Sequence, residues 1–377
     1  MKIAQVESIL AADTHYVRIT TDDGTTGTGQ SGAWAYPAAV HSVVTQFEQY
    51  LVGQDPLRIE HHWQHLYRMG PFRGSILSAA ISAVDIALWD IKGKHLQAPI
   101  WQLLGGRCRD RVRLYQIVVA EDPDAVAAAA RSAAEDGFTA IKFDPLPSTY
   151  KDMTLPRLAE SAAAMVAAAR EAVGLDVDII LELHRRLTPL QVPTVAAAVR
   201  PFRPLYIEDP IQIDSISSQA EIARRLDLAV ANGERMHTIW EFRELLTQGG
   251  AQYLRPDIGL AGGLTHCKKI AAVAESYHAA VVTHNFLGPV LTAASVHLDV
   301  SIPNFVVQEY YKKADEEGPV DEAYPGALKR QGGYLPVPEA PGLGVEVNEA
   351  KAWSIWPPGH DFTSTPLRTD GSIAFSV

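Results

Sequence analysis

Residues 179–235 decide the fold, because three short apolar runs in this stretch each lead to an acidic residue. The runs are IILELH (179–184), LYIEDP (205–210) and VANGER (230–235), and their acidic residues are Glu182, Glu208 and Glu234. Glu208 follows Glu182 by 26 residues, and Glu234 follows Glu208 by the same interval. About 25 residues is the length of one strand, one helix and two short loops, so the interval predicts βα units with a polar residue at each strand's C-terminal end.

The repeat extends in both directions from this stretch. It continues with Asp257 in YLRPD, His284 in VVTHN and Glu309 in FVVQE, at steps of 23, 27 and 25 residues. Upstream, VRLYQIVV (112–119) and AIKFDP (140–145) predict two further strands, and the spacing of apolar residues predicts helices at 122–135 and 156–173. Eight strands alternating with helices predict a closed (β/α)-barrel, whose polar strand ends share one active site.

The segments outside the repeat predict a second unit. The first 30 residues have strand patterns around the turn Asp22-Asp23-Gly24, and residues 37–96 have a helical pattern that is most regular at 75–91. The tail after Lys313 is rich in Pro and Gly, and we expect it to return to this N-terminal unit. The predicted fold class is therefore α/β, with an α+β capping domain (1–110), a modified TIM (β/α)-barrel (111–315) and a returning C-terminal segment (316–377).

Composition and charge exclude several classes of protein. The net charge of −11 without a basic patch argues against nucleic acid or an anionic membrane as a partner. The two cysteines, Cys108 and Cys267, form no disulfide scaffold and fit a reducing cytosol, so a cytoplasmic location is expected. The N-terminal MKIAQVESIL lacks the pattern of a signal peptide, and no run of about 18 apolar residues predicts a membrane span.

The three glutamates predict a metal site. Glu182, Glu208 and Glu234 would converge at neighbouring strand ends, where three carboxylates cannot all stay ionised without a cation. Ligands that are all oxygen atoms indicate Mg²⁺ rather than Zn²⁺. The alternative, three unrelated surface carboxylates, does not explain their equal spacing after apolar strands.

Two histidines are candidates for proton transfer. Asp257 and His284 end neighbouring strands, and a carboxylate bonded to an imidazole is the usual arrangement of a general base. His184 lies two residues beyond Glu182, so on an extended strand both side chains share one face. It is a candidate acid or second base, and the alternative for each histidine is a structural role.

Several charged residues remain open between a role in the site and a structural ion pair. Glu309 would bind a substrate carboxylate or form a salt bridge. Lys142 and Asp144 end the second strand on one face, where either could reach the site. Arg185 or Arg186 would hold a substrate anion or lie in a solvated loop.

With these residues placed, the chain resembles the mandelate racemase subgroup of the enolase superfamily. The resemblance covers essentially the whole chain and rests on AAISAVDIALWDIKGK (79–94), PIWQLLGG (99–106), YIEDP, NGE, RPDIGLAGG and THN. It implies a capping domain on a modified TIM barrel, one Mg²⁺ per subunit and a homo-oligomer. It also implies that Glu182, Glu208 and Glu234 bind the metal, that Asp257 and His284 form the base, and that Glu309 binds the substrate carboxylate.

Two departures from the subgroup's pattern bear on the reaction. The family commonly has Asp where Glu182 stands, and its racemases carry Lys-x-Lys where this chain has Lys142-Phe143-Asp144. Acid-sugar dehydratases of the subgroup often carry a histidine two residues after the first metal ligand, as His184 does. The resemblance therefore implies a dehydratase of an aldonate, similar to the galactonate dehydratase type, that gives a 2-keto-3-deoxy acid.

The resemblance also suggests substrate-binding residues and rival activities. Tyr150 is a possible further acid or base, because some relatives use a tyrosine there. From the capping domain, Trp34 and Phe72 would exclude water, and Arg73 would bind a distal hydroxyl or carboxylate or else form a surface salt bridge. The rivals are an epimerase or cycloisomerase of a sugar acid or anhydro-sugar acid, and a non-catalytic binding protein of the same fold. The sequence does not reveal which sugar acid is bound.

Overall fold

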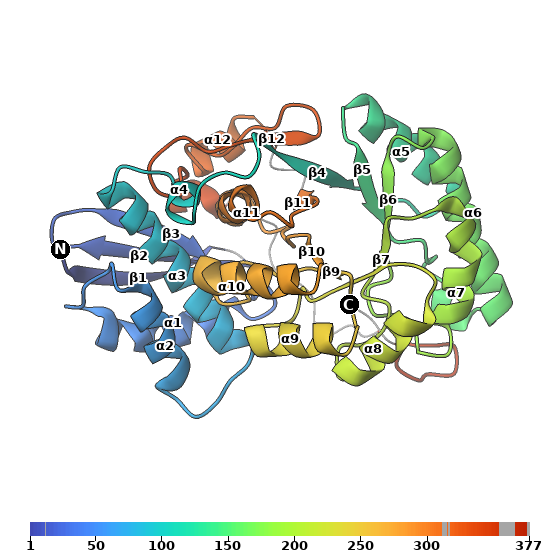
Figure 1. Cartoon of the computed structure of the whole chain (residues 1–377), viewed down its shortest axis with the longest axis horizontal. Helices are drawn as coiled ribbons and strands as arrows, with labels where there is room; N and C mark the ends of the chain where they lie inside the picture. Colours follow the sequence, from blue (N-terminus) through green and yellow to red (C-terminus); the bar gives the residue numbers. More distant parts are fainter. Residues whose placement is uncertain (12, 311–314, 316, 354–365, 375–377) are drawn as a thin grey trace.

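The computed structural model describes residues 1–11, 13–310, 315, 317–353 and 366–374. The N-terminal residues form an antiparallel sheet packed against helices, at the end of the molecule that is blue in Figure 1. The sheet has the order β1 (Ile3–Ala11), β2 (Thr14–Thr21), β3 (Thr26–Gln30), and the helices are α1 (Pro37–Leu51), α2 (Ile59–Arg68), α3 (Ser75–His95) and the short α4 (Ile100–Leu103). This α+β unit agrees with the strand and helix patterns predicted for residues 1–96.

Residues 111–310 form a curled parallel sheet surrounded by helices (Figure 1). The strands are β4 (Arg111–Ile117), β5 (Ala140–Phe143), β6 (Asp178–Glu182), β7 (Tyr206–Glu208), β8 (Val230–Asn232), β9 (Tyr253–Leu254), β10 (Ala280–Val281) and β11 (Gln308–Tyr310). The sheet runs in the order β10-β9-β8-β7-β6-β5-β4-β11. Val281 N donates to Asn304 O at 2.8 Å and Val306 N donates to Val281 O at 3.0 Å, so β10 also joins the segment leading into β11 and the ring closes. The predicted modified TIM barrel is confirmed.

Helices connect the strands along the chain. They are α5 (Pro123–Glu135), α6 (Leu155–Val173), α7 (Val192–Val199), α8 (Ile216–Arg225), α9 (Ile239–Thr247), α10 (Gly263–Ser276) and α11 (Pro289–Ser301). Local sequence sets where they begin. The side chain of Asp122 accepts from Ala125 N at the start of α5, and Thr238 and Glu241 form a capping box at the start of α9. The predicted helices at 122–135 and 156–173 therefore begin within one residue of their predicted starts.

The strands are shorter than their apolar runs predicted. The observed β9 and β10 have two residues each, so Asp257 and His284 lie beyond the regular strands in the loops that follow. An isolated parallel bridge still pairs Asp257 with His284. The sheet therefore fixes the direction of the chain, and the loop conformations place the functional side chains.

The C-terminal segment contacts both units. It contains α12 (Pro319–Ala323), β12 (Tyr334–Pro336), which pairs antiparallel with β4, and α13 (Glu349–Ala352). Tyr324 Oη lies 2.8 Å from Tyr16 Oη of β2, and Leu343 N donates to the Asp90 carboxylate of α3 at 2.8 Å. The segment thus links the N-terminal sheet to the first barrel strand.

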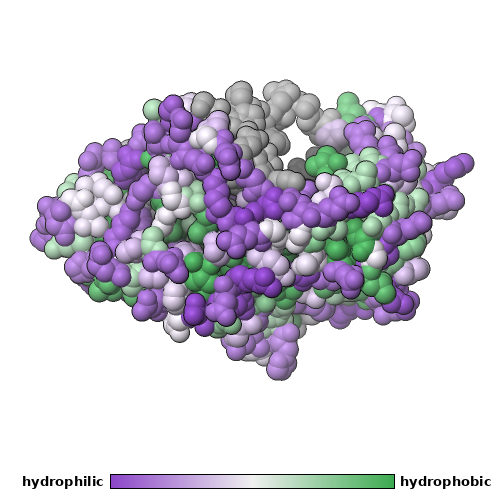
Figure 2. All heavy atoms as spheres, turned by 90° about the horizontal axis from the view of Figure 1, so that it is seen from above, coloured by the Kyte–Doolittle hydropathy of each residue, from purple (hydrophilic) through white to green (hydrophobic). Residues whose placement is uncertain are grey.

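Buried hydrogen bonds hold the N-terminal unit against the barrel. Ser82 Oγ of α3 accepts from Gly262 N at 2.8 Å and from Gly263 N at 3.1 Å, at the start of α10. Thr265 N donates to the Asp85 carboxylate at 3.0 Å, and burial raises the pKa of Asp85 to about 7. The face of the molecule in Figure 2 is mainly hydrophilic. No helix in the described residues is long and apolar enough to cross a membrane.

Candidate active site

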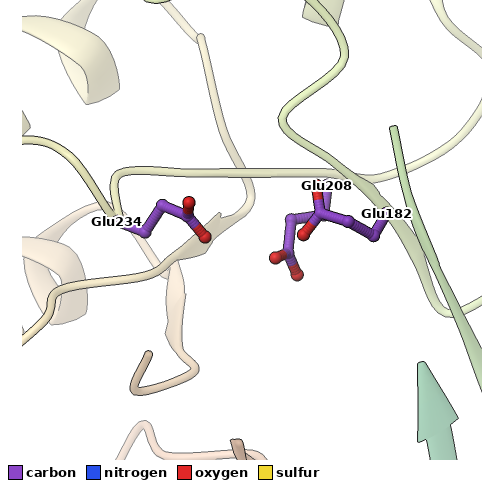
Figure 3. Close-up of side chains that lie close together, drawn as sticks. All are labelled: Glu182, Glu208 and Glu234. Carbon is purple, nitrogen blue, oxygen red and sulfur yellow. The ribbon is translucent and has the colours of Figure 1, made fainter. Parts of the chain in front are cut away.

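The three predicted metal ligands come together at the C-terminal ends of β6, β7 and β8. Glu182 and Glu208 are the last residues of their strands and pair in register, while Glu234 follows β8 after Gly233. One oxygen of each carboxylate lies within 4.8 Å of the others, and the three side chains face a common space in Figure 3. Gly233 has φ of 128°, and a Cβ there would lie 2.5 Å from the ring of Phe242, so this turn requires glycine.

The chemistry of this cluster fits a hard divalent cation. Glu208 Oε2 is buried, and the described residues offer it no hydrogen-bond partner. Burial and the nearby Glu182 raise the pKa of Glu208, although Arg255 acts in the opposite direction. Two buried carboxylates this close cannot both ionise easily without additional positive charge. An orphaned carboxylate oxygen inside an all-oxygen cluster is therefore suited to binding Mg²⁺.

Lys142, on β5, forms ion pairs across the site. Its Nζ lies 3.2 Å from Glu182, 2.8 Å from Glu208 and 2.9 Å from Glu309. Burial disfavours the charge, but Glu208 and Glu309 raise the pKa of Lys142 well above its ordinary value. The Lys142 amine therefore stays protonated among these carboxylates, and Glu309 is one of its ionised partners.

Arg255 is a second buried cation beneath the carboxylates. Its side chain is 0% exposed, and Nη2 lies 2.9 Å from Glu208, 3.0 Å from Glu309 and 3.5 Å from Glu234. Its Nη1 donates to Tyr115 Oη at 2.9 Å. Sequence reasoning missed this residue. Its position in the sequence could have identified it, because Arg255 precedes Asp257 by two residues in YLRPD and so lies at the end of the same strand.

His284 and Asp257 form the predicted imidazole–carboxylate pair. His284 Nδ1 lies 2.7 Å from Asp257 Oδ2, and Asp257 Oδ1 accepts from Gly259 N at 2.7 Å. The other ring nitrogen, Nε2, lies 3.6 Å from both Glu234 and Glu309. Burial opposes a charge on the ring, but these carboxylates outweigh it and raise the pKa of His284. The arrangement fixes Nδ1 and leaves Nε2 for proton transfer.

His184 also has a carboxylate partner. His184 Nδ1 lies 3.3 Å from Asp144 Oδ2, which also pairs with Arg186 at 2.6 Å. The backbone N of His184 donates to Glu182 Oε1 at 2.8 Å. With φ of 48°, His184 is in the left-handed region rather than on an extended strand. It therefore reaches the site through a loop turn, and not through the strand alternation that the sequence suggested.

A cavity of about 520 Å³ lies over these residues. Its lining includes both histidines, Lys142, Glu309, Trp34 and Asp144. Trp34 meets Phe286 edge to face at a ring distance of 5.8 Å, and Phe286 meets His284 in the same way at 5.5 Å. Trp34 thus lies against the aromatic wall beside the proposed base. Phe286 was not predicted, although it lies only two residues after His284.

Three predicted substrate-binding residues, Phe72, Arg73 and Tyr150, lie outside the cavity lining, which differs from the prediction for them, whereas Arg185 lines the cavity. Arg185 is 1% exposed, and it pairs with Asp209 and, at 2.9 Å, with Glu234, so its guanidinium is already engaged. Phe72 is 85% exposed, and Arg73 packs over Tyr67 with 4.5 Å between guanidinium and ring centre; neither lines the cavity.

Tyr150 also lies outside the cavity lining. The Arg186 guanidinium is 5.4 Å from its ring centre. Asp144 lines the cavity, but its carboxylate is occupied by His184 and Arg186. Its position therefore indicates support for a neighbouring histidine rather than direct binding of substrate.

Comparisons with known proteins agree with this geometry. Residues 3–105 match the N-terminal domain of the mandelate racemase / muconate lactonizing enzyme family, and residues 124–351 match the enolase C-terminal domain-like family. The chain is 38% identical to D-galactonate dehydratase of Ralstonia nicotianae and 36% identical to that of Ralstonia pickettii, in each case over 95% of both chains. It also matches the crystal structure of an enolase from Agrobacterium radiobacter with bound Na and L-malate, at 30% identity, a TM-score of 0.92 and full coverage of both chains.

Proposed function

The chain belongs to the mandelate racemase / muconate lactonizing enzyme family of the enolase superfamily, and from this premise we propose that it is a Mg²⁺-dependent dehydratase of a sugar acid. One observation carries the proposal: two imidazoles, each bonded to a carboxylate, line the same cavity as Glu182 and Glu234 of the three-glutamate cluster. Dehydration needs one group to take a proton and another to give one, and this site supplies both. The D-galactonate dehydratase relatives favour an aldonate as the substrate.

Glu182, Glu208 and Glu234 would hold the metal. Bound there, Mg²⁺ supplies positive charge where negative charge develops on the substrate carboxylate as the α-proton leaves. Even without the metal, Lys142 and Arg255 neutralise part of the negative charge of the glutamates, so these carboxylates can lie close together.

His284 takes the α-proton in this proposal. Asp257 holds Nδ1 at 2.7 Å, so the proton passes to Nε2, the nitrogen on the other side of the ring. Asp257 orients the ring and stabilises the imidazolium that forms. The nearby Trp34–Phe286 pair limits the access of water to the base.

His184 gives a proton to the departing 3-hydroxyl. Asp144 lies against its Nδ1, so Nε2 is the nitrogen available to the substrate. The C–O bond at carbon 3 breaks, water leaves, and the resulting enol tautomerises to a 2-keto-3-deoxy acid. A symmetric two-base racemase is less well supported, because Asp144 stands where a second lysine would be needed and Lys142 is held protonated by carboxylates.

The test separates the two histidines in deuterated solvent. Purified protein with Mg²⁺ is assayed against a panel of aldonates and aldarates, with mass spectrometry of product and recovered substrate. We expect His284→Asn to lose both deuterium exchange and loss of water. His184→Asn and, more weakly, Asp144→Asn should lose dehydration but keep some exchange. His61→Asn, at an exposed position on α2, is the control for a histidine substitution.

Other outcomes have defined meanings. Exchange without loss of water in the wild-type protein would indicate an epimerase, and a product with the substrate's composition but a different connectivity would indicate a cycloisomerase. Binding of the acids with neither exchange nor loss of water would indicate a non-catalytic protein. The metal content of His184→Asn must equal that of the wild type, because His184 N bonds to Glu182.

A further inference from the structure

The end of β3 reaches from the N-terminal unit to the loop that follows β10. Gln30, the last residue of β3, is 0% exposed, and its Nε2 donates to the backbone O of Leu287 at 3.0 Å. Leu287 belongs to the 284–288 loop, which lies between β10 and α11 and carries His284 and Phe286. This hydrogen bond therefore links the N-terminal unit to the segment that holds the proposed base.

The link continues through the loop to the carboxylates of the site. Leu287 N donates to Asn285 Oδ1 at 3.1 Å, and Asn285 N donates to Glu309 Oε2 at 3.1 Å. Glu309 Oε2 lies 3.6 Å from His284 Nε2, the ring nitrogen that faces the cavity. A chain of hydrogen bonds therefore runs from Gln30 to the carboxylate beside the base.

The same capping segment contacts the other half of the imidazole–carboxylate pair. Gly32 N donates to Gly259 O at 2.7 Å, and Gly259 N donates to Asp257 Oδ1 at 2.7 Å. Residues 30–32 therefore contact two loops, one that carries His284 and one that carries its carboxylate partner. The placement of both groups depends on where this segment lies.

Burial of the Gln30 amide is unfavourable in itself. Its Oε1 has no hydrogen-bond partner among the described residues. A buried amide oxygen without a partner destabilises the folded state, and an apolar side chain of similar size would avoid that cost. The glutamine is therefore better explained as a hydrogen-bond donor to the 284–288 loop than as a stabilising core residue.

We propose that Gln30 is a positioning residue for removal of the α-proton. It holds the 284–288 loop from the N-terminal unit, and the loop holds His284 and Glu309 in the reactive arrangement. This inference rests on the proposed function and adds a residue that lies outside the cavity lining. Gln30 acts on the rate through the loop and not on substrate binding. A displacement of about 1 Å at a reacting group can lower a rate by about a hundredfold.

The kinetic test removes the donor. Gln30→Met keeps the length of the side chain, and with Mg²⁺ and an accepted acid it should lower kcat for loss of water and for substrate deuterium exchange by about tenfold to a hundredfold, while KM changes by less than about twofold. Gln30→Asn keeps the amide but is too short to reach Leu287 O, so it should have the same effect. It decides the test if Gln30→Met does not fold.

Gln219→Met is the matched control. Gln219 is 1% exposed on α8 and lies outside the cavity lining, and the described residues offer its amide no hydrogen-bond partner. The control therefore replaces an equally buried glutamine that is not linked to the 284–288 loop. It should leave kcat and KM unchanged.

Backbone amide exchange, followed by mass spectrometry, tests the loop without substrate. Peptides that cover 284–288 should exchange faster in Gln30→Met than in the wild type or in Gln219→Met, because the N–H groups of Asn285 and Leu287 are hydrogen-bonded in the linked loop. Unchanged kcat in Gln30→Met, or a lower kcat without faster amide exchange, would overturn the inference. If the wild type dehydrates no acid, the proposed function fails, and amide exchange alone decides whether Gln30 positions the loop.

Discussion

Replacing Arg255 with methionine tests whether this buried cation stabilises the carboxylates around it. The variant removes a fully buried cation that lies 2.9 Å from Glu208 and 3.0 Å from Glu309, although both carboxylates still pair with Lys142. Removing one partner of a buried ion pair costs about 3–5 kcal/mol, because the remaining charge stays out of water. An unfolding entropy near 2.1 cal/mol/K per residue gives about 0.8 kcal/mol/K for 377 residues, so Tm should fall by roughly 4–6 °C.

The assay is thermal unfolding in EDTA and again in excess Mg²⁺. A bound cation replaces part of the lost charge, so Mg²⁺ should raise the Tm of Arg255→Met by more than it raises that of the wild type. Arg200→Met removes an exposed ion pair with Asp227 and is the control, with an expected cost below about 1 kcal/mol. If Arg255→Met and Arg200→Met have the same Tm, or if Mg²⁺ stabilises the wild type more, the reasoning about the cluster is refuted.

Three further predictions test the metal, the base and the unit junction. Glu208→Gln should lose both the Mg²⁺-dependent thermal shift and the activity while circular dichroism stays native; full turnover in EDTA would contradict the metal site. Gly32→Ala would place a Cβ 2.7 Å from Asp257 Oδ1 and should slow α-proton exchange, whereas Gly70→Ala meets nothing within 4 Å and should not. Because burial raises the pKa of Asp85 from 3.8 to about 7, the folded state holds this proton and the contribution of Asp85 to stability falls as pH rises from about 4 to about 7. Denaturant unfolding should therefore show that Asp85→Asn gains stability relative to the wild type as pH rises from about 4 to about 7, with an upper limit of about 4 kcal/mol; a pH-independent difference would be inconsistent with this.

The sequence predicted the barrel well because its signal is periodic. Glu182 and Glu208 end observed strands, and the carboxylate cluster follows from their equal spacing. Asp257 and His284 were found for the same reason, although their strands have only two residues each. Periodicity locates the ends of strands, and the ring geometry then brings these ends together.

Side chains in loops could not be placed in this way. His184 was expected in the site because of strand alternation, but it lies in a left-handed turn, a conformation that apolar periodicity does not encode. Arg185 and Arg255 are buried because they satisfy carboxylates that come from other strands, so their burial depends on long-range pairing. Phe72 and Arg73 were placed by analogy with a capping loop, and their exposure depends on loop conformation, which residue type does not specify.

Gly32 has a consequence for exchanging parts between related enzymes. Its N donates to Gly259 O at 2.7 Å, and Gly259 N in turn bonds to Asp257 Oδ1, which leaves no room for a side chain at position 32. The segment around Trp34 and the segment around Asp257 are therefore tightly packed together, although Gly32 and Asp257 lie 225 positions apart in the sequence. A chimera that imports a new capping loop to change the substrate should also take residues 257–260 from the enzyme that supplies the loop. Otherwise the new loop will displace Asp257 and impair the base.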